Sequence, residues 1–277
     1  MADTISFKHS GDIGDIIASL STVKEICERS GKKAKMYLDA TGGWMDPYVK
    51  LQAPNGLKFN ESAALFLKPY LEIQPYIDSV EIDTTYGNKK MDYNLNAFRR
   101  AFVDTAAIKE TNQNLLYLHQ YALGVPCGYK GPWLVDPTKE AHRQDGVLIA
   151  RTTRYQSAHV MIEAILRNIR NAGLTPDFIG TDVEHAAFEE AFRTKTNRIK
   201  ISNALEMAAQ VANHGEILCN GTALYWIAVG LGHPSITHEV GCDIPTTMWR
   251  DDMPNIMYIQ GAKMMRGDHK RELGMKQ

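Results

Sequence analysis

The chain has 277 residues, of which 44% are hydrophobic and 23% charged, an ordinary globular composition that argues against a disordered chain. Its 31 basic and 32 acidic residues give a formal net charge of -1, which supplies no overall attraction to nucleic acid or acidic lipid. No apolar run reaches about 18 residues, so the sequence predicts no transmembrane segment.

The cysteines and the N-terminus predict the compartment. Cys27, Cys127, Cys219 and Cys242 lie far apart without a CxxC pair, so we expect free thiols and neither a zinc site nor a disulfide framework. The first ten residues mix charged with apolar side chains, unlike a signal peptide. A cytoplasmic protein is the resulting expectation.

The first half of the chain alternates strand-like and helix-like segments. Short apolar runs rich in β-formers predict strands at 4–7, 34–38, 79–82 and 93–95. Helical spacing predicts helices at 16–26, 62–73 and 113–123. Glycines and prolines predict an irregular loop over residues 39–60.

The second half repeats the alternation more regularly. Glycines and prolines predict a linker at 126–146, between a domain at 1–135 and another at 146–277. We expect strands at 147–150, 177–180, 198–201, 216–219 and 235–238, with helices at 159–172, 183–193, 204–213 and 222–231. This pattern is typical of a doubly wound parallel sheet, whose ligands bind at the carboxyl ends of the strands. The basic tail from Lys263 predicts a solvated helix or a frayed end.

The loop of residues 9–15, between the first strand and its helix, is the first candidate site. It lacks the spacing of a dinucleotide fingerprint and of a P-loop. Asp12 and Asp15 would repel a phosphate here, but either can accept a proton from a hydroxyl. The alternative is that one of them caps the helix, which contributes about 1 kcal/mol.

Two further candidates follow strands of the second half. Arg151 and Arg154 come directly after its first strand, and guanidinium groups bind phosphate oxygens in a bidentate manner. Asn220, Gly221 and Thr222 form a sharp strand-to-helix turn, whose helix start is suited to an anion. A solvated arginine cluster and an ordinary capped turn are the respective alternatives.

Three more positions lie at or near strand ends on the same predicted edge. Gly180 and Glu184 flank the turn after the second strand, where they can contact a nucleoside. The alternative is that Thr181 or Asp182 simply caps the next helix. Glu239 follows the last core strand and can reach ribose hydroxyls. We therefore include Gly180, Glu184 and Glu239 in the predicted donor site.

These segments resemble the heptosyltransferases of lipopolysaccharide assembly and their relatives among inverting GT-B glycosyltransferases. Residues 14–16, Gly-Asp-Ile, are similar to that family's Gly-Asp-Val/Ile motif, and residues 178–184 resemble its strand-Gly-x-x-x-Glu segment. Residues 220–223 and 228–234 resemble its phosphate turn and the Gly-x-Pro exit of the following helix. The likeness covers most of the chain.

The resemblance implies a GT-B-like α/β fold, with two Rossmann-like α/β/α domains facing a central cleft. It also implies that Asp15 is the catalytic base. The chain departs from the family at three positions: Gly221 replaces an aspartate, Ala223 a glycine and Trp226 a histidine. Thr222 is retained, and backbone amides need no particular side chain, so phosphate binding withstands these departures better than recognition of heptose does.

We therefore expect a glycosyltransferase that moves a sugar from a nucleoside diphosphate donor to an acceptor hydroxyl, with inversion and without a metal or another cofactor. The residues leave the acceptor open: a saccharide, a lipid-linked glycan, a modified nucleobase or a protein. They also leave open the oligomeric state and two rival functions. One rival is a sugar-nucleotide epimerase or hydrolase of the same fold, and the other is a non-catalytic protein that binds nucleotide sugars.

Overall fold

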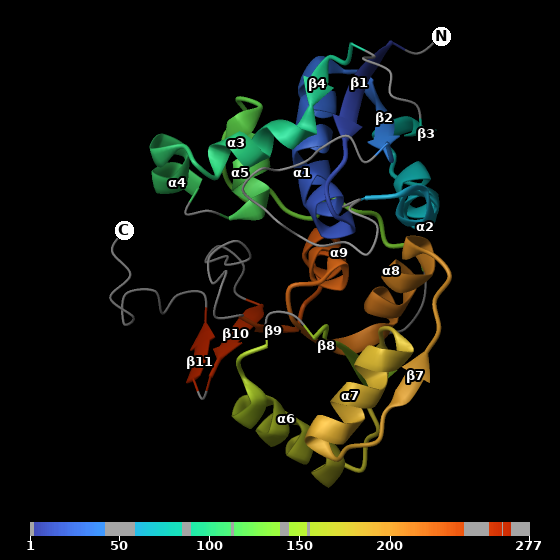
Figure 1. Ribbon diagram of the computed structural model, residues 1–277, viewed down its shortest axis with the longest axis vertical. Coiled ribbons are helices and arrows are strands. Elements are labelled where there is room, and N and C mark those ends of the chain that lie inside the picture. Colours follow the sequence, from blue (N-terminus) through green and yellow to red (C-terminus); the bar gives the residue numbers. More distant parts are fainter. Residues whose placement is uncertain are drawn as a thin grey trace. The chain divides into compact units, whose positions relative to one another are not determined.

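The computed structural model describes residues 3–41, 59–84, 90–111, 114–138, 144–153, 156–240, 255–261 and 263–266 (Figure 1). The chain divides into two units. The first comprises residues 1–128, 132–135 and 202–205, and the second comprises residues 129–131, 136–201 and 206–277. The predicted linker at 126–146 thus includes residues of both units.

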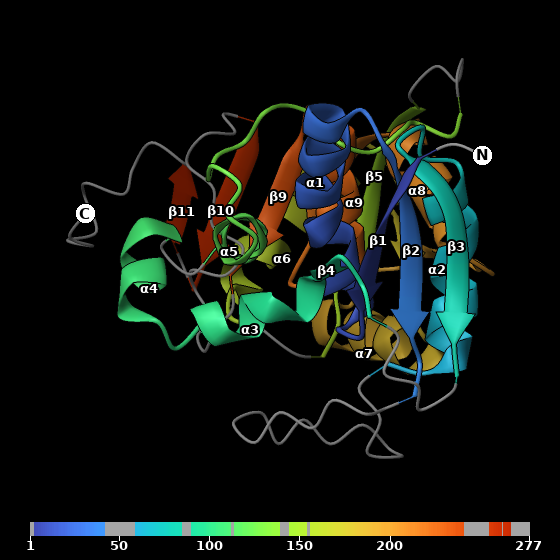
Figure 2. The ribbon, with the colours of Figure 1, turned by 90° about the horizontal axis from the view of Figure 1, so that it is seen from above.

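The first unit is built on a parallel sheet in the order β3-β2-β1-β4. Its strands are β1 (Thr4–His9), β2 (Lys33–Asp39), β3 (Ile77–Asp83) and β4 (Tyr93–Asn94). Its helices are α1 (Ile13–Ser30), α2 (Glu61–Glu72), α3 (Phe98–Ala101), α4 (Thr105–Thr111) and α5 (Leu115–Ala122), with a 3-10 turn at Leu95–Ala97. Figure 2 shows β1, β2 and β3 side by side and running in the same direction.

All four strands and three helices predicted for this half are confirmed. The short helices α3 and α4 were not predicted, because four and seven residues are too few to show a helical period. Most of the loop expected at 39–60 lies outside the described residues.

Helix α1 shows how the sequence sets the ends of an element. Asp12 is its N-cap, and Gly31 ends it in the left-handed conformation with a φ of 69°. Between them, Ile16, Ile17 and Leu20 are fully buried. The helix is therefore fixed at its first turn, which carries Asp15.

Residues 132–135, which we expected to form part of the linker, pack against the first unit. The Trp133 indole N–H donates to the Ile17 carbonyl at 3.1 Å, and the Tyr76 hydroxyl donates to the Trp133 carbonyl at 2.9 Å. Trp133 is buried as a result. This segment is therefore part of the first unit's structure.

The second unit contains a seven-stranded sheet in the order β11-β10-β9-β8-β5-β6-β7. Its strands are β5 (Gln144–Ala150), β6 (Asp177–Ile179), β7 (Asn197–Ile199), β8 (His214–Cys219), β9 (Ile236–Glu239), β10 (Ile256–Gln260) and β11 (Lys263–Arg266). Its helices are α6 (His159–Asn171), α7 (Asp182–Phe192), α8 (Ala204–Asn213) and α9 (Ala223–Leu231). The five strands and four helices predicted here are confirmed.

The end of this sheet corrects one expectation. The basic tail from Lys263 was expected to be a solvated helix or a frayed end, but residues 263–266 form β11, antiparallel to β10 at the sheet edge (Figure 2). Gly261, at a φ of 58°, makes the tight turn between them. Neither strand was predicted, because edge strands this short depend on the neighbour with which they pair.

Helix α9 is buried on all sides. Each residue from Leu224 to Gly230 is buried, in agreement with its uniformly apolar sequence. A helix held this firmly fixes the position of its first turn, which is the start of the predicted phosphate site.

Candidate functional site

The strand order of the second unit defines a switch point. Strand β5 lies between β6 and β8; from β5 the chain moves outward through β6 to β7, and then returns to β8 on the other side. Right-handed crossovers therefore place α6, after β5, and α9, after β8, on opposite faces of the sheet. In open α/β sheets, ligands bind outside the carboxyl ends of the strands at such a point.

Asn220 joins the two loops that meet there. Its side-chain oxygen accepts from the Thr152 backbone N–H at 3.0 Å, and its side-chain nitrogen donates to the Thr152 carbonyl at 3.0 Å. Asn220 is fully buried, so both bonds are shielded from water. The predicted ligand contact is thus an internal clamp, which holds the loop after β5 against the loop after β8.

The turn after β8 presents the N-terminus of α9. Thr222 is the N-cap, and its hydroxyl accepts from the Tyr225 N–H at 3.4 Å. The Thr222 N–H donates to the Asn220 carbonyl at 2.6 Å, which tightens the turn around Gly221. The partial positive charge of a helix start, beside the clamped loop, suits a phosphate group.

Arg151 and Glu239 form a buried ion pair with each other. The guanidinium donates from Nε to Oε2 at 2.6 Å and from Nη2 to Oε1 at 3.0 Å, and it lies over the Phe192 ring. Arg151 is 5% exposed and Glu239 1%. The charge of Arg151 is thus compensated within the protein, and its predicted contact with a diphosphate stays a prediction.

Glu239 has a second structural task. Its Oε1 accepts from the Ser157 N–H at 2.6 Å and from the Ala158 N–H at 2.8 Å, immediately before α6. A carboxylate from β9 thus occupies the anion position at the start of α6. Both carboxylate oxygens of Glu239 are thus bonded within the fold, and its predicted contact with ribose stays a prediction.

The turn after β6 is a capping box. The Thr181 hydroxyl accepts from the Glu184 N–H at 3.2 Å, and Glu184 Oε2 accepts from the Thr181 N–H at 2.9 Å. A Cβ atom at Gly180 would lie 2.6 Å from the Phe178 ring, so this position requires glycine. The capping alternative for Thr181 is confirmed, and the roles of Gly180 and Glu184 in binding a donor stay predictions.

Arg154 lies outside the described residues, so its predicted contact with a diphosphate also stays a prediction. Among the residues that are described, no cluster of histidine, cysteine, aspartate and glutamate is arranged to hold a metal ion. None of the helices in the same residues is long and apolar enough to cross a membrane.

The first unit has a switch point of its own, between β1 and β4. The chain leaves β1 through α1 toward β2 and β3, and β4 pairs with the other edge of β1. Here Asn96 joins the two loops: its side-chain oxygen accepts from the Ser10 N–H at 3.0 Å and from the Ser10 hydroxyl at 3.1 Å. An asparagine thus links the loops at both switch points.

Asp15 lies at this first switch point, in the opening turn of α1. Its Oδ2 accepts from the Asp12 N–H at 3.2 Å, which completes a capping box, and from Arg99 Nη2 at 3.1 Å. The Asp15 side chain is 17% exposed and that of Arg99 8%. Asp15 therefore caps the helix while part of its side chain is open to solvent, so the two readings of this residue are compatible.

Sequence reasoning did not find Asn96 or His119. The structure also pairs Arg99 with Asp15. Asn96 follows a predicted strand, so its position at a carboxyl end was a usable signal. His119 lies within a predicted helix, and nothing in its sequence surroundings marked it.

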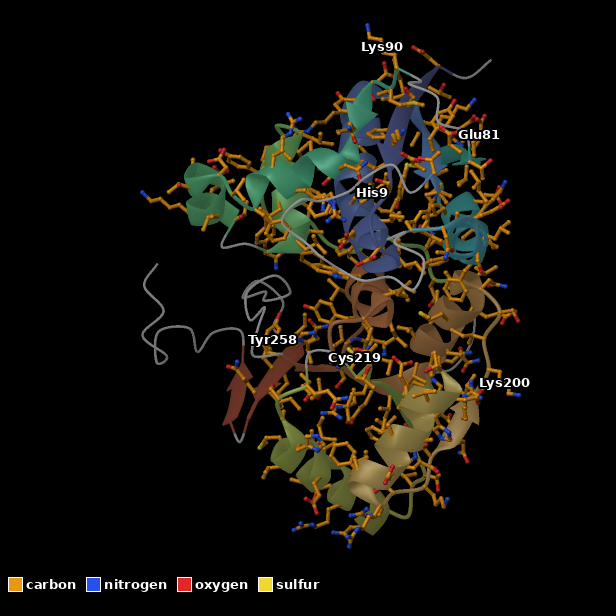
Figure 3. The ribbon with its side chains drawn as sticks, viewed as in Figure 1. His9, Glu81, Lys90, Lys200, Cys219 and Tyr258 are labelled. Carbon is orange, nitrogen blue, oxygen red and sulfur yellow. The ribbon has the colours of Figure 1, made fainter. Side chains whose placement is uncertain are left out.

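His238 shows the effect of burial on a histidine in the second unit. It lies beside the Tyr225 and Tyr258 rings, with centroid distances of 4.2 and 5.9 Å (Figure 3 labels Tyr258). Within the described parts of the chain, neither ring nitrogen has a hydrogen-bond partner. Burial lowers the pKa of His238 to about 3.

This depressed pKa predicts a contribution to acid sensitivity. The unfolded chain binds the proton below its ordinary pKa of about 6.5 and the folded chain only near 3, so stability falls as the pH drops through that window. We expect His238→Phe to remove up to about 1.4 kcal/mol per pH unit from that slope. Urea unfolding at pH 7, 6, 5 and 4 measures it, and equal slopes in both proteins would contradict it.

Comparison with known proteins identifies the type of fold. No protein-family model matches the chain, and no curated protein sequence does. Among solved structures, E. coli heptosyltransferase WaaC with ADP matches with a TM-score of 0.63 and 9% identity over 98% of both chains. The chain has a heptosyltransferase-like fold.

Two further structures agree. The glycosyl transferase family 9 protein from Veillonella parvula DSM 2008 has a TM-score of 0.61 and 11% identity, over 92% of this chain and 85% of that one. E. coli ADP-heptose lps heptosyltransferase II has a TM-score of 0.58 and 12% identity, over 94% and 92%. The predicted GT-B-like fold class is confirmed, whereas identities this low carry the fold alone.

Proposed function

We propose that this chain is a glycosyltransferase that moves a sugar from a nucleoside diphosphate to an acceptor hydroxyl, with inversion and without an essential metal. The observation that carries the proposal is the N-terminus of α9 at the β5/β8 switch point, in a chain with a heptosyltransferase-like fold. The Asn220 clamp supports it, because it fixes the loops around that helix start.

An ADP-sugar is the first donor to test. The structures with the same fold include WaaC with ADP and WaaC with ADP-2-deoxy-2-fluoro heptose. In this chain the amides around Gly221 and Thr222 would hold the diphosphate, and Arg154 would add a cationic contact. Gly180 and Glu184 would contact the nucleoside, and the acceptor stays open.

The proposed chemistry is a single displacement. The acceptor oxygen bonds to the anomeric carbon as the bond from that carbon to the diphosphate oxygen breaks, and the leaving diphosphate takes the bonding electrons. Asp15 accepts the acceptor's proton. The helix dipole and the amides of α9 offset the charge that develops on the leaving group, so the mechanism as proposed calls for no metal.

Arg151 and Glu239 have a supporting role in this proposal. Their ion pair joins the end of β5 to β9, and Glu239 also holds the start of α6. Because Thr152 follows Arg151 directly and is bonded to Asn220, the pair holds this part of the chain beside the turn that leads into α9. In this proposal the pair positions the chain after β5 beside the donor and does not itself contact the donor.

Nucleotide binding is the first test. We expect ADP and ADP-heptose to raise the melting temperature, since ligand at 100 times its Kd stabilises by about 2.7 kcal/mol. Thr222→Ala should weaken that shift, because it alters the start of α9. Asn60→Ala is the matched control: Asn60 caps α2 in the first unit, so its loss should cost comparable stability and leave the nucleotide shift unchanged.

The same experiment separates the rival functions. No shift with any nucleoside diphosphate or sugar nucleotide at saturating concentration would overturn the donor site. Where a shift is found, incubation with radiolabelled donor distinguishes the remaining cases. Label on an acceptor indicates transfer, free sugar indicates hydrolysis, a changed sugar nucleotide indicates epimerisation, and binding without turnover indicates a binding protein.

A further inference from the structure

Two histidines meet near the start of α1, whose first turn carries Asp15. His9 ends β1, and His119 lies in α5; both are fully buried, and their Nε2 atoms are 3.2 Å apart (Figure 3 labels His9). They are 110 residues apart in sequence. Neither histidine has a role in the chemistry proposed above.

The surrounding hydrogen bonds fix the tautomer of each ring. His119 Nδ1 lies 2.8 Å from the Leu115 carbonyl, which only accepts, so this nitrogen carries the proton. His9 Nδ1 accepts from the Gly11 N–H at 2.9 Å, so it carries none. In neutral rings, His9 therefore donates from Nε2 to the bare Nε2 of His119. The bonds run in one direction, from Gly11 through His9 to His119.

Neutral rings are required for this arrangement. A proton on His119 Nε2 would face the N–H of His9 and break the bond. Burial, with a smaller contribution from the charge of Arg99, lowers the pKa of His119 to about 3. The acceptor nitrogen is thus available throughout the neutral range.

The same histidine is linked to Asp15 from the other side. The His119 ring stacks on Phe98 with centroids 4.1 Å apart, and the Arg99 guanidinium lies 4.9 Å from the Phe98 centroid. Arg99 in turn donates to Asp15. A closed circuit of contacts therefore runs from Gly11 through His9, His119, Phe98 and Arg99 to Asp15.

Gly11 completes this set of contacts, and it is tightly packed. A Cβ atom there would lie 2.6 Å from His9 Cε1 and 2.7 Å from Asp15 Oδ2, so the glycine backbone packs directly between ring and carboxylate. A shift of the His9 ring would therefore move the loop on which Asp15 depends.

We propose that His119, acting through His9 and Gly11 on one side and through Phe98 and Arg99 on the other, is the positioning residue for the Asp15 carboxylate. The inference rests on the proposed role of Asp15 as the base. It adds a residue to the site that the sequence motifs did not assign. Its task is geometric: a base is effective only within hydrogen-bond reach of the proton that it accepts.

The test compares two substitutions of one side chain. His119→Phe keeps a ring against Phe98 and removes the acceptor for His9, whereas His119→Gln offers a side-chain oxygen near the position of Nε2. We expect His119→Phe to lower kcat for transfer at least tenfold, with ADP binding unchanged. His119→Gln should recover most of that loss. Amide hydrogen exchange at Gly11 should accelerate at least tenfold in the first variant alone.

His214→Phe is the matched control in the second unit. His214 is buried, and its Nδ1 bonds to the Gln210 carbonyl at 2.7 Å, four residues earlier, as His119 does with Leu115. This variant loses a comparable buried histidine far along the chain from Asp15. Exchange at Gly11 should stay at its wild-type rate.

Two measurements do not depend on catalysis. Nitrogen-15 spectra of the wild-type histidines should show the proton on Nε2 of His9 and on Nδ1 of His119 at pH 7. The opposite tautomer on either ring, or unchanged Gly11 exchange in His119→Phe, would overturn the inference even if no transfer is ever detected. If transfer is found and kcat survives His119→Phe, the inference is wrong while the proposed function stands.

Discussion

Replacing Asp15 by asparagine is expected to lower kcat for sugar transfer by about 10²- to 10⁴-fold, the usual contribution of a general base. Asparagine keeps the size of the side chain and an oxygen for the Asp12 N–H, so the helix cap can persist. It cannot accept the acceptor's proton. The measurement is steady-state transfer from radiolabelled ADP-heptose, with the melting temperature recorded in parallel.

Asp12→Asn is the control for this substitution. Asp12 lies three residues away and is the N-cap of the same helix, and asparagine is as good a cap as aspartate. We expect its activity to stay within a few-fold of wild type. Equal losses in the two variants would indicate that the turn is only a helix start, and full activity in Asp15→Asn would eliminate Asp15 as the base.

The second large effect is on stability. We expect Arg151→Met to destabilise the second unit by about 3–5 kcal/mol, because it leaves the Glu239 carboxylate buried beside α6 without its cation. Glu239→Gln should cost a similar amount by leaving the guanidinium uncompensated. The double variant should lose less than the sum of the two, since no lone charge remains. Urea unfolding followed by circular dichroism measures all three.

The control is an ion pair at the surface. Arg29 and Glu25 lie one turn apart in α1, and half of the Arg29 side chain is exposed. Such pairs contribute about 0.3–0.5 kcal/mol, so Arg29→Met should have little effect. If Arg151→Met behaved like Arg29→Met and instead abolished the nucleotide shift, Arg151 would be a direct phosphate contact after all.

The sequence predicted strands and helices better than it predicted contacts between side chains. Strands β5 to β9 follow from short apolar runs between turn residues, which are local properties of the chain. The pairing of Arg151 with Glu239 joins residues 88 positions apart and depends on β8 lying between β5 and β9. No single segment of the sequence determines the order of the strands. Arg151 and Glu239 were therefore predicted to face a ligand.

In the candidate site, too, the sequence predicted the positions of residues but not their partners. Asp15, Asn220 and Thr222 were found because each lies in or beside a loop that joins a strand to a helix. What they do there was decided by distant partners: Arg99 binds the carboxylate of Asp15, and Thr152 takes both polar atoms of the Asn220 amide. His119 was missed because a histidine among apolar residues in a helix gives no sign of the ring it will meet.

The Asn220 clamp also bears on how the protein ages. Asparagine followed by glycine, as at residues 220 and 221, is prone to deamidation in flexible exposed chains, where the glycine nitrogen can attack the side-chain amide. Here the side chain is fully buried and its nitrogen is held on the Thr152 carbonyl, so the fold restrains that reaction. The aspartate it would create has no N–H for that carbonyl and would add negative charge beside α9. The folded second unit thus preserves the chemical integrity of its own loop.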